Sequence, residues 1–221
     1  MSTREKISVG ECYHVLNRGV DKRSIIKGEC DSRRFVESLE FFNTKKPVGH
    51  LRDIPEYKTR GSTAEIHEPL VEIICYALNP NHFHLLLKEV SDGGISELMK
   101  RLSGGYTWYF NNKHKRSGAL FQGRFKSVHI ESNEQLLHVS AYINLNNQAH
   151  KIRGGSAKII RSSYGEYLGI SDKSICSKEI ILGQFKTLKE YKDFAELSLK
   201  EIIKAKENKE GIEMLICKYF F

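Results

Sequence analysis

Residues 73–88 constrain the fold of this chain most strongly, because they describe two apolar strands joined by a short turn. Residues 73–78 are apolar throughout, a turn of sequence Asn79-Pro80-Asn81 follows, and residues 85–87 are three leucines. Short apolar runs on either side of Pro and Asn are typical of a hairpin buried in a sheet. His82 and His84 open its second strand. Since successive side chains of a strand point to opposite faces, both imidazoles are expected on one face.

Two imidazoles on one face of a sheet are half of a metal site. Neutral imidazoles suit Zn, Mn, Fe, Ni or Cu, whereas a mixed site with an amide or carboxylate oxygen and open positions suits Mg or Mn acting on a phosphate. By spacing alone, such a pair is more often two partly buried histidines that hydrogen bonds satisfy. The spacing of His82 and His84 therefore leaves both interpretations open.

The segment from Ser132 to Asn146 predicts a helix that carries a candidate nucleophile. Ser132 is a plausible cap, and the apolar spacing fits a helix through Leu136, Val139 and Ile143. Tyr142 and Asn146 would then share one face. A phenol with a pKa near ~10 is a poor nucleophile at neutral pH, so it needs a nearby cation to stabilise the charge that develops on a phosphate. With ten tyrosines in the chain, ordinary packing is the competing interpretation.

Tyr106 and Tyr109 are the competing tyrosines, and both are predicted to be core residues. They lie on the apolar stripe of a helix that begins near Ile95.

Positive charge is concentrated where a nucleic acid could bind. The chain carries a net charge of +8, and no acidic residue occurs between Lys100 and Ile130. Basic residues interleaved with aromatic ones suit phosphate contacts combined with base stacking. A solvated basic face with the aromatics packed inward is the alternative. A second basic segment is the turn at residues 17–23. The candidate DNA-binding residues are Arg18, Arg23, Lys100, Arg101, Arg116, Arg124 and Lys126.

Four motifs occur together in one order: "YHVLNRGVDKRSI", "ALNPNHFHLLLKE", "SGALFQGRFKS" and "AYINLNNQA". With them the chain resembles the REP-associated tyrosine transposases, within the single-tyrosine HUH transposases, from about Tyr13 to about Tyr167. The resemblance implies that His82, His84 and Asn146 hold a divalent metal, Mg or Mn, and that Tyr142 attacks single-stranded DNA. Where relatives usually have Asn-Pro, this chain has Asn146-Asn147, so a different end of the tyrosine helix is expected.

The order of predicted elements is β-α-β-β-α-β. Strands at 12–17 and 125–130 precede and follow the hairpin in the sequence, a helix at 32–43 is capped by Asp31, and a second helix starts at 95. This pattern predicts an α+β, ferredoxin-like antiparallel sheet with helices on one face, an extra tyrosine-bearing helix and a C-terminal helical extension. We expect a catalytic domain at 1–170, with a mobile insertion at 44–69, and an extension at 171–221 that packs onto it. No membrane span or signal segment is evident, and five cysteines without paired spacing indicate a reduced, cytoplasmic protein.

The leading functional hypothesis is metal-dependent cleavage and strand transfer of single-stranded or hairpin DNA through a 5′-phosphotyrosine intermediate. One alternative is a relative that binds hairpin DNA without cutting it. The other is a metal-dependent phosphodiesterase that uses an activated water and leaves Tyr142 as a packing residue. The protein could be a monomer or a homodimer, and the short link before Ser132 suggests that the tyrosine helix serves its own chain.

Overall fold

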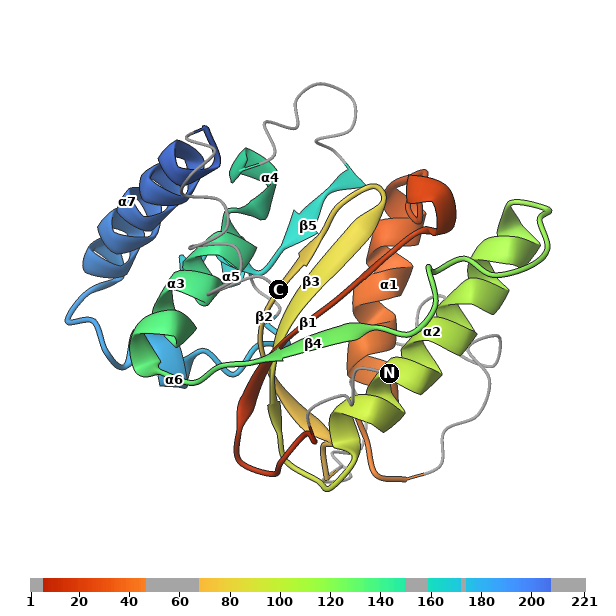
Figure 1. Cartoon of the computed structure of the whole chain (residues 1–221), viewed down its shortest axis with the longest axis horizontal. Helices are drawn as coiled ribbons and strands as arrows, with labels where there is room; N and C mark the ends of the chain where they lie inside the picture. Colours follow the sequence, from red (N-terminus) through yellow and green to blue (C-terminus); the bar gives the residue numbers. More distant parts are fainter. Residues whose placement is uncertain (1–5, 47–67, 150–158, 172–173, 208–221) are drawn as a thin grey trace.

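A five-stranded antiparallel sheet organises the chain (Figure 1). The computed structural model describes residues 6–46, 68–149, 159–171 and 174–207. The expected insertion at 44–69 lies almost entirely outside these residues. The strand order is β4-β1-β3-β2-β5. The strands are β1 (Cys12–Arg18), β2 (Val71–Leu78), β3 (His82–Glu89), β4 (Lys126–His129) and β5 (Arg161–Ser162).

The predicted hairpin lies at the centre of the sheet. β2 and β3 pair through almost their whole length, and the Asn79 N–H donates to the carbonyl of His82 at 2.9 Å to close the turn. Strand β3 lies between β1 and β2, and its side chains belong to hydrophobic clusters on both faces of the sheet, which explains the continuous apolar run.

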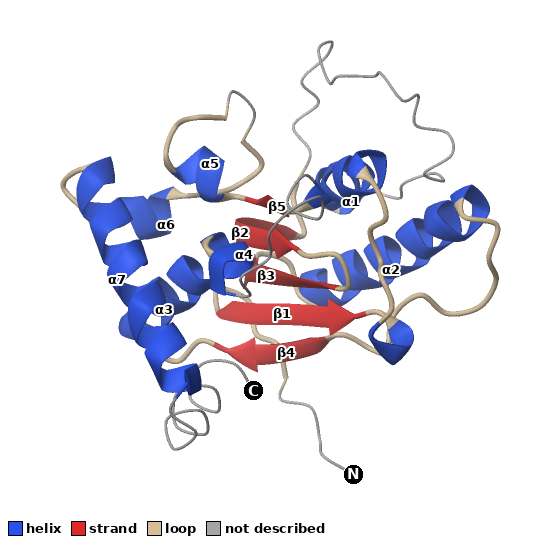
Figure 2. Cartoon of the chain, turned by 90° about the horizontal axis from the view of Figure 1, so that it is seen from above, coloured by secondary structure: helices blue, strands red, loops and turns tan. Residues whose placement is uncertain are grey.

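One face of the sheet is covered by α1 (Glu29–Phe42) and α2 (Gly94–Lys113), as Figure 2 shows. Phe35 and Tyr106 from these helices pack edge to face against each other, and Phe35 also contacts Phe83 of β3. This face is the larger hydrophobic core. A short 3₁₀ helix, η1 (Val20–Lys22), follows β1.

The opposite face is covered by α3 (Asn133–Asn144), with α7 (Leu188–Glu207) packed against it (Figures 1 and 2). Ser132 caps α3 by accepting the Gln135 N–H at 3.1 Å, and the Gln135 side chain accepts the N–H of Glu131 at 2.7 Å. The pair resembles a capping box, except that the second bond goes to the residue before the cap. The described residues also form three short helices, which are α4 (Asn146–Ala149), α5 (Tyr164–Tyr167) and α6 (Glu179–Leu182).

The predicted α+β architecture is confirmed. The two helices of the β-α-β-β-α-β pattern share one face, and the tyrosine-bearing helix and the C-terminal helix α7 form a second layer on the other. Helix α7 packs onto the sheet domain through α3. No helix within the described ranges has the length and hydropathy needed to cross a bilayer.

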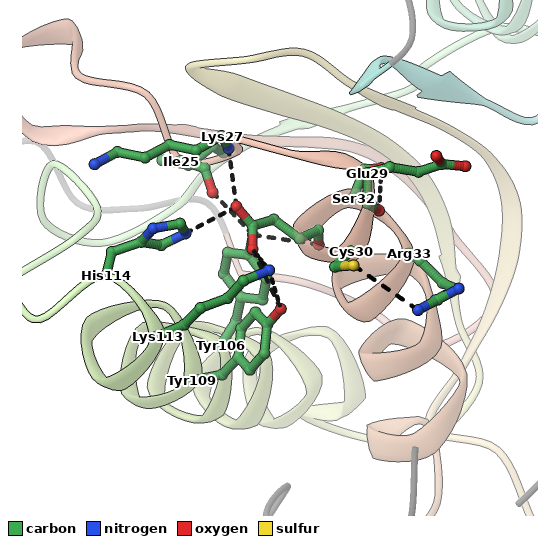
Figure 3. A network of polar contacts seen from close by, with 11 residues as sticks. Ile25, Lys27, Glu29, Cys30, Ser32, Arg33, Tyr106, Tyr109, Lys113 and His114 are labelled. Carbon is green, nitrogen blue, oxygen red and sulfur yellow. Dashed lines mark hydrogen bonds and ion pairs between the residues drawn. The ribbon is translucent and has the colours of Figure 1, made fainter. Parts of the chain in front are cut away.

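A buried carboxylate fastens α1 to the end of α2. Asp31 is fully buried and accepts hydrogen bonds from Lys113 Nζ at 2.7 Å, His114 Nε2 at 2.9 Å and the Lys27 N–H at 2.9 Å. Figure 3 shows Lys113, His114 and Tyr109 converging on the start of α1. Burial would raise the pKa of Asp31, but these hydrogen bonds outweigh it and the pKa is lowered. The contact fixes where the chain leaves α2 for the basic loop that follows.

The expectation that two tyrosines of α2 are core residues holds for one of them. Tyr106 is fully buried and its hydroxyl donates to the carbonyl of Ile25 at 2.8 Å. Tyr109 is only half-buried, and its hydroxyl donates to Asp31 Oδ1 at 3.2 Å. Its polar tip therefore belongs to the contact between the helices rather than to the apolar core.

Candidate metal and nucleic-acid site

The hydrogen bonds of His82 define which of its ring nitrogens carries a lone pair. His82 Nδ1 lies 2.7 Å from Asn81 Oδ1, and His82 Nε2 lies 3.0 Å from the side-chain nitrogen of Asn79. An amide oxygen only accepts and an amide nitrogen only donates, so Nδ1 carries the proton and Nε2 is the acceptor. A second hydrogen bond that orients a neutral imidazole in this way is characteristic of histidines that bind metals.

His84 is supported by a third histidine that the sequence analysis did not identify. His84 Nδ1 lies 2.8 Å from Nε2 of His14 on β1, and the two rings stack with centroids 5.0 Å apart. His14 is fully buried, and burial lowers its pKa to about 4. Neutral His14 therefore shares one proton with His84 and holds that ring in place. The rings of His82 and His84 lie edge to face with centroids 5.1 Å apart.

Tyr142 packs against the second histidine of the motif. Its ring meets that of His84 edge to face, with centroids 5.6 Å apart and an interplanar angle of 83°. Tyr142 is buried, which raises its pKa, and a side-chain hydrogen bond with Asn146 acts in the opposite direction. The tyrosine of one chain thus lies beside the histidines of the same chain.

Tyr142 and Asn146 do not share one continuous helix, which corrects the expectation from their spacing. Helix α3 ends at Asn144, Leu145 is its C-cap, and Asn146 begins the short helix α4. The side chains of Tyr142 and Asn146 are still hydrogen-bonded to each other, because only Leu145 separates the two helices. Asn146 is fully buried, and its Oδ1 accepts a hydrogen bond from Asn79 Nδ2 at 2.5 Å.

These donor atoms fit a divalent cation. His82 Nε2 and Asn146 Oδ1 both present lone pairs to the same amide nitrogen of Asn79, so a single small group already bridges them. A set of imidazole nitrogens and an amide oxygen suits Mg or Mn as well as softer metals. Among the described residues, no three His, Cys, Asp or Glu side chains form a metal-binding cluster. A cation here would therefore depend on the amide of Asn146.

Two of the candidate basic residues lie on the histidine face of the sheet. Arg18 pairs directly with His82 across β1 and β3, and Lys126 lies in one row with Leu16 and His84 across β4, β1 and β3. Residues directly opposite one another in a sheet point to the same face. Since neighbouring strands are about 4.8 Å apart, Lys126 is roughly 10 Å from the backbone of His84.

The loops that carry the remaining candidates are joined at the same end of the sheet. Gly19 bridges to Phe121, the Gln122 N–H donates to the Arg18 carbonyl at 2.7 Å, and the Gly19 N–H donates to the Asn81 carbonyl at 2.9 Å. The turn at 17–23, the loop at 118–124 and the histidine turn therefore form one surface. Arg124 is exposed on it.

The other predicted DNA contacts have protein partners in the structure. Arg23 donates to the Val20 carbonyl and pairs with Asp21, and Lys100 pairs with Glu97. Two arginines are more firmly held. Arg101 pairs with Glu97 and donates to the carbonyls of Phe42 and Thr44, and Arg116 donates to Asn111 and to the Ala119 carbonyl.

Three comparisons place this chain among known proteins. Residues 11–148 match the family model described as "Transposase IS200 like". The chain belongs to the IS200-like transposases. The match runs from β1 into α4 and includes four of the five strands, Tyr142 and both histidines of the hairpin.

The resemblance to tyrosine transposases deduced from the sequence is thus confirmed at the level of the family. The transposase is also similar to a solved structure titled "Structure of the REP associates tyrosine transposase bound to a REP hairpin", with 15% sequence identity and a TM-score of 0.46. That match covers 80% of this chain and 97% of the other. Among curated proteins no match was found.

Sequence reasoning missed the three residues that hold the histidines: His14, Asn79 and Asn81. Two of them were visible as the turn residues of the hairpin, but a turn residue is normally explained by its backbone. His14 carried a clearer signal, because it lies at an alternate position of a strand and so could share a face with other polar groups.

Proposed function

We propose that this IS200-like transposase cleaves and rejoins single-stranded DNA at hairpin sites through a covalent bond to Tyr142. In the proposal, His82, His84 and Asn146 hold a divalent cation, Mg or Mn. The supporting observation is that one chain gathers the nucleophile and all three ligands. Asn146 touches Tyr142 on one side and is bridged to His82 on the other, and the Tyr142 ring lies on His84.

The reaction follows from the chemistry of a buried phenol. The raised pKa of Tyr142 keeps the hydroxyl protonated at neutral pH, so its proton must leave as the oxygen attacks. The Tyr142 oxygen forms a bond to the scissile phosphorus, the bond from phosphorus to the 3′ oxygen breaks, and that oxygen takes up a proton to leave a free 3′-OH. When bound, the cation would stabilise the charge that develops on the phosphate.

The covalent product retains the energy of the phosphodiester. A 3′-OH from another strand can attack the phosphotyrosine and release Tyr142, which joins DNA without ATP. The chain's own residues contribute position: His14 and Asn81 orient the two imidazoles, and Asn146 touches the attacking hydroxyl.

DNA in this proposal lies across the surface formed by the turn at 17–23 and the loop at 118–126. Arg18, Arg124 and Lys126 are its main phosphate contacts, since they are exposed at the histidine end of the sheet. Arg23 and Lys100 are secondary contacts. Arg101 and Arg116 act through the loops they hold, because their guanidinium groups already donate to carbonyls.

The test is a denaturation-resistant adduct between the protein and DNA. A single-stranded oligonucleotide with a hairpin, labelled at its 3′ end, is incubated with the protein and Mn²⁺ and run on a denaturing gel. The parent is expected to form a labelled adduct that chelator prevents, and Tyr142→Phe is expected to form none. Tyr164→Phe is the matched control, because among the described residues the Tyr164 hydroxyl has no hydrogen-bond partner.

Each alternative function has its own outcome in this experiment. Retention of the hairpin without cleavage, in Mg²⁺ and in Mn²⁺, would indicate a binding protein. Cleavage by Tyr142→Phe that leaves no covalent species would indicate a phosphodiesterase that uses water. An adduct formed equally well by Tyr142→Phe would exclude this tyrosine as the nucleophile. A linear oligonucleotide of equal length tests the preference for hairpins.

We propose further that Tyr142 acts within its own chain and that the extension at 171–221 stabilises the tyrosine helix of the domain at 1–170. The contact between Tyr142 and His84 supports the first point, and the packing of α7 on α3 supports the second. Mixing inactive His82→Ala and Tyr142→Phe proteins tests the first point. Restored cleavage in the mixture would mean that two chains share one site.

A further inference from the structure

We infer that Asn79 supplies a fourth protein ligand to the proposed cation site, through its side-chain oxygen. This inference rests on the proposed function, since it concerns the site formed by His82, His84 and Asn146. It adds a residue that lies outside the paired histidines and outside the tyrosine helix.

Asn79 occupies the place where the ligand atoms converge. It begins the turn between β2 and β3, and its backbone N–H donates to the carbonyl of His82 at 2.9 Å. Its side chain is buried, and one atom, Nδ2, lies 3.0 Å from His82 Nε2 and 2.5 Å from Asn146 Oδ1. The amide hydrogens of Asn79 thus use the same lone pairs that a cation would take.

An amide NH₂ and a cation cannot bind these lone pairs at once. The NH₂ carries positive partial charge, so it satisfies the two acceptors in the way a cation would. Rotation of the terminal amide about its last side-chain bond exchanges nitrogen for oxygen with little other movement, since this torsion is broad and nearly two-fold. The rotated Asn79 would present an acceptor to the cation instead of a donor.

A second observation indicates the same rotation. Asn79 Oδ1 is buried, and within the described part of the chain it has no hydrogen-bond partner. Buried amide oxygens are normally satisfied, and an unsatisfied one costs free energy. Coordination of a cation by Oδ1 would give this oxygen a partner, and it would leave His82 and Asn146 with the cation in place of the NH₂.

The resulting ligand set has two imidazole nitrogens and two amide oxygens, all uncharged. Additional oxygen ligands favour Mg and Mn over Zn, which prefers nitrogen and sulfur and four-coordinate sites. Six-coordinate geometry would leave two positions for oxygens of a DNA phosphate. Asn79 would therefore contribute both affinity and metal selectivity.

The competing explanation is that the NH₂ of Asn79 only occupies the position of the cation while the site is empty. If Asn79 only bridges the two ligands and withdraws when the cation enters, its removal would free the lone pairs and leave Mn²⁺ affinity unchanged or tighter. A ligand and a placeholder therefore predict changes of opposite sign.

The experiment measures Mn²⁺ binding to the full chain by the electron paramagnetic resonance signal of free Mn²⁺. Asn79→Leu, of similar size and without an acceptor, is expected to weaken binding about 10- to 100-fold, as loss of a metal-site group does. Asn79→Asp keeps an oxygen and is expected to bind at least as tightly as the parent. Asn112→Leu, at an exposed position of α2, is the matched control.

A measurement on the parent keeps the inference testable if Asn79→Leu does not fold. In protein labelled with ¹³C at the asparagine side-chain carbonyl, electron-nuclear double resonance on bound Mn²⁺ is expected to detect two coupled carbonyl carbons. One coupled carbon, or equal or tighter binding by Asn79→Leu, would overturn the role of Asn79 alone. A parent that binds no Mn²⁺ would overturn the proposed cation site as well.

Discussion

Replacing Asp31 by Asn tests whether the buried carboxylate fastens α2, and the basic loop after it, to α1. Both carboxylate oxygens are used: Oδ1 accepts from Lys113 and Tyr109, and Oδ2 accepts from His114 and the Lys27 N–H. Whichever way the new amide turns, its NH₂ faces donors. The change therefore leaves buried donors unsatisfied and also removes the charge that pairs with Lys113.

The expected loss in the free energy of unfolding follows from the burial of Asp31. Removing one partner of a buried ion pair typically costs about 3–5 kcal/mol. The Lys113 side chain is 36% exposed, so its ammonium can turn to water, and we expect the lower half of that range. For a protein of this size each kcal/mol lowers Tm by about 2–4 °C, which gives a fall of about 6–16 °C.

The assay is urea unfolding at neutral pH, with Glu37→Gln as the matched control. Glu37 pairs with Arg33 at 3.9 Å on the exposed side of α1, and such surface pairs contribute about 0–1 kcal/mol. A loss below about 1 kcal/mol for Asp31→Asn, equal to that of the control, would refute the argument from burial.

The pH dependence of the stability difference between the parent and Asp31→Asn tests the direction of the pKa shift of Asp31. Because the pKa of Asp31 is lowered in the folded state, its ionised form contributes stability that is fully present above the unfolded value near ~3.9 and is lost as pH falls through the folded value. The gap between parent and Asp31→Asn should therefore be constant from pH 7 to about 5 and shrink below about pH 4. A gap that widens on acidification would contradict the lowered pKa.

Two further predictions concern the DNA surface and the tyrosine helix. Arg124→Ala should weaken binding of hairpin DNA and reduce the slope of log K against log salt by about 1, measured by fluorescence anisotropy at several NaCl concentrations, whereas loss of a structural residue would leave the slope unchanged. Tyr191→Phe should cost about 1–3 kcal/mol in urea unfolding, because the buried amide of Asn144 loses its 2.7 Å bond to the Tyr191 hydroxyl; an unchanged midpoint would mean that α7 does not hold α3 by this contact.

Most of the sheet could be predicted, because its strands and helices carry strong periodicity. The hairpin, strands β1 and β4 and the helices of the two layers lie where apolar spacing places them, whereas the short edge strand β5 was not predicted. Boundaries were less certain. Asp31 was expected to cap a helix starting at Ser32, but α1 starts at Glu29 and Asp31 lies within the first turn, where its carboxylate reaches back to the Lys27 N–H. An acidic residue near a helix start satisfies a backbone donor from either position, so sequence alone does not separate them.

In the candidate metal site, the sequence predicted only the residues that belong to the family motifs. His14 contacts His84 because β1 and β3 are neighbours in the sheet. The local sequence does not predict which strands are neighbours. Asn79 was visible as a turn residue, yet its side chain becomes informative only once α4 brings Asn146 to 2.5 Å from it. Contacts between elements distant in sequence decide such sites, and a single sequence does not reveal them.

The arrangement of the two layers defines how DNA could reach Tyr142. Helices α3 and α7 cover the histidine face on one side, so the proposed approach is from the other, over β4 and β1, where Lys126 and Arg18 lie. From Lys126 to the row of His84 is roughly 10 Å, a distance that a few nucleotides span. A phosphate held by Lys126 and a phosphate at the histidines would then belong to one short stretch of a single strand. In the proposed function, α3 packed on the sheet would then confine the DNA strand to the side of β4 and β1.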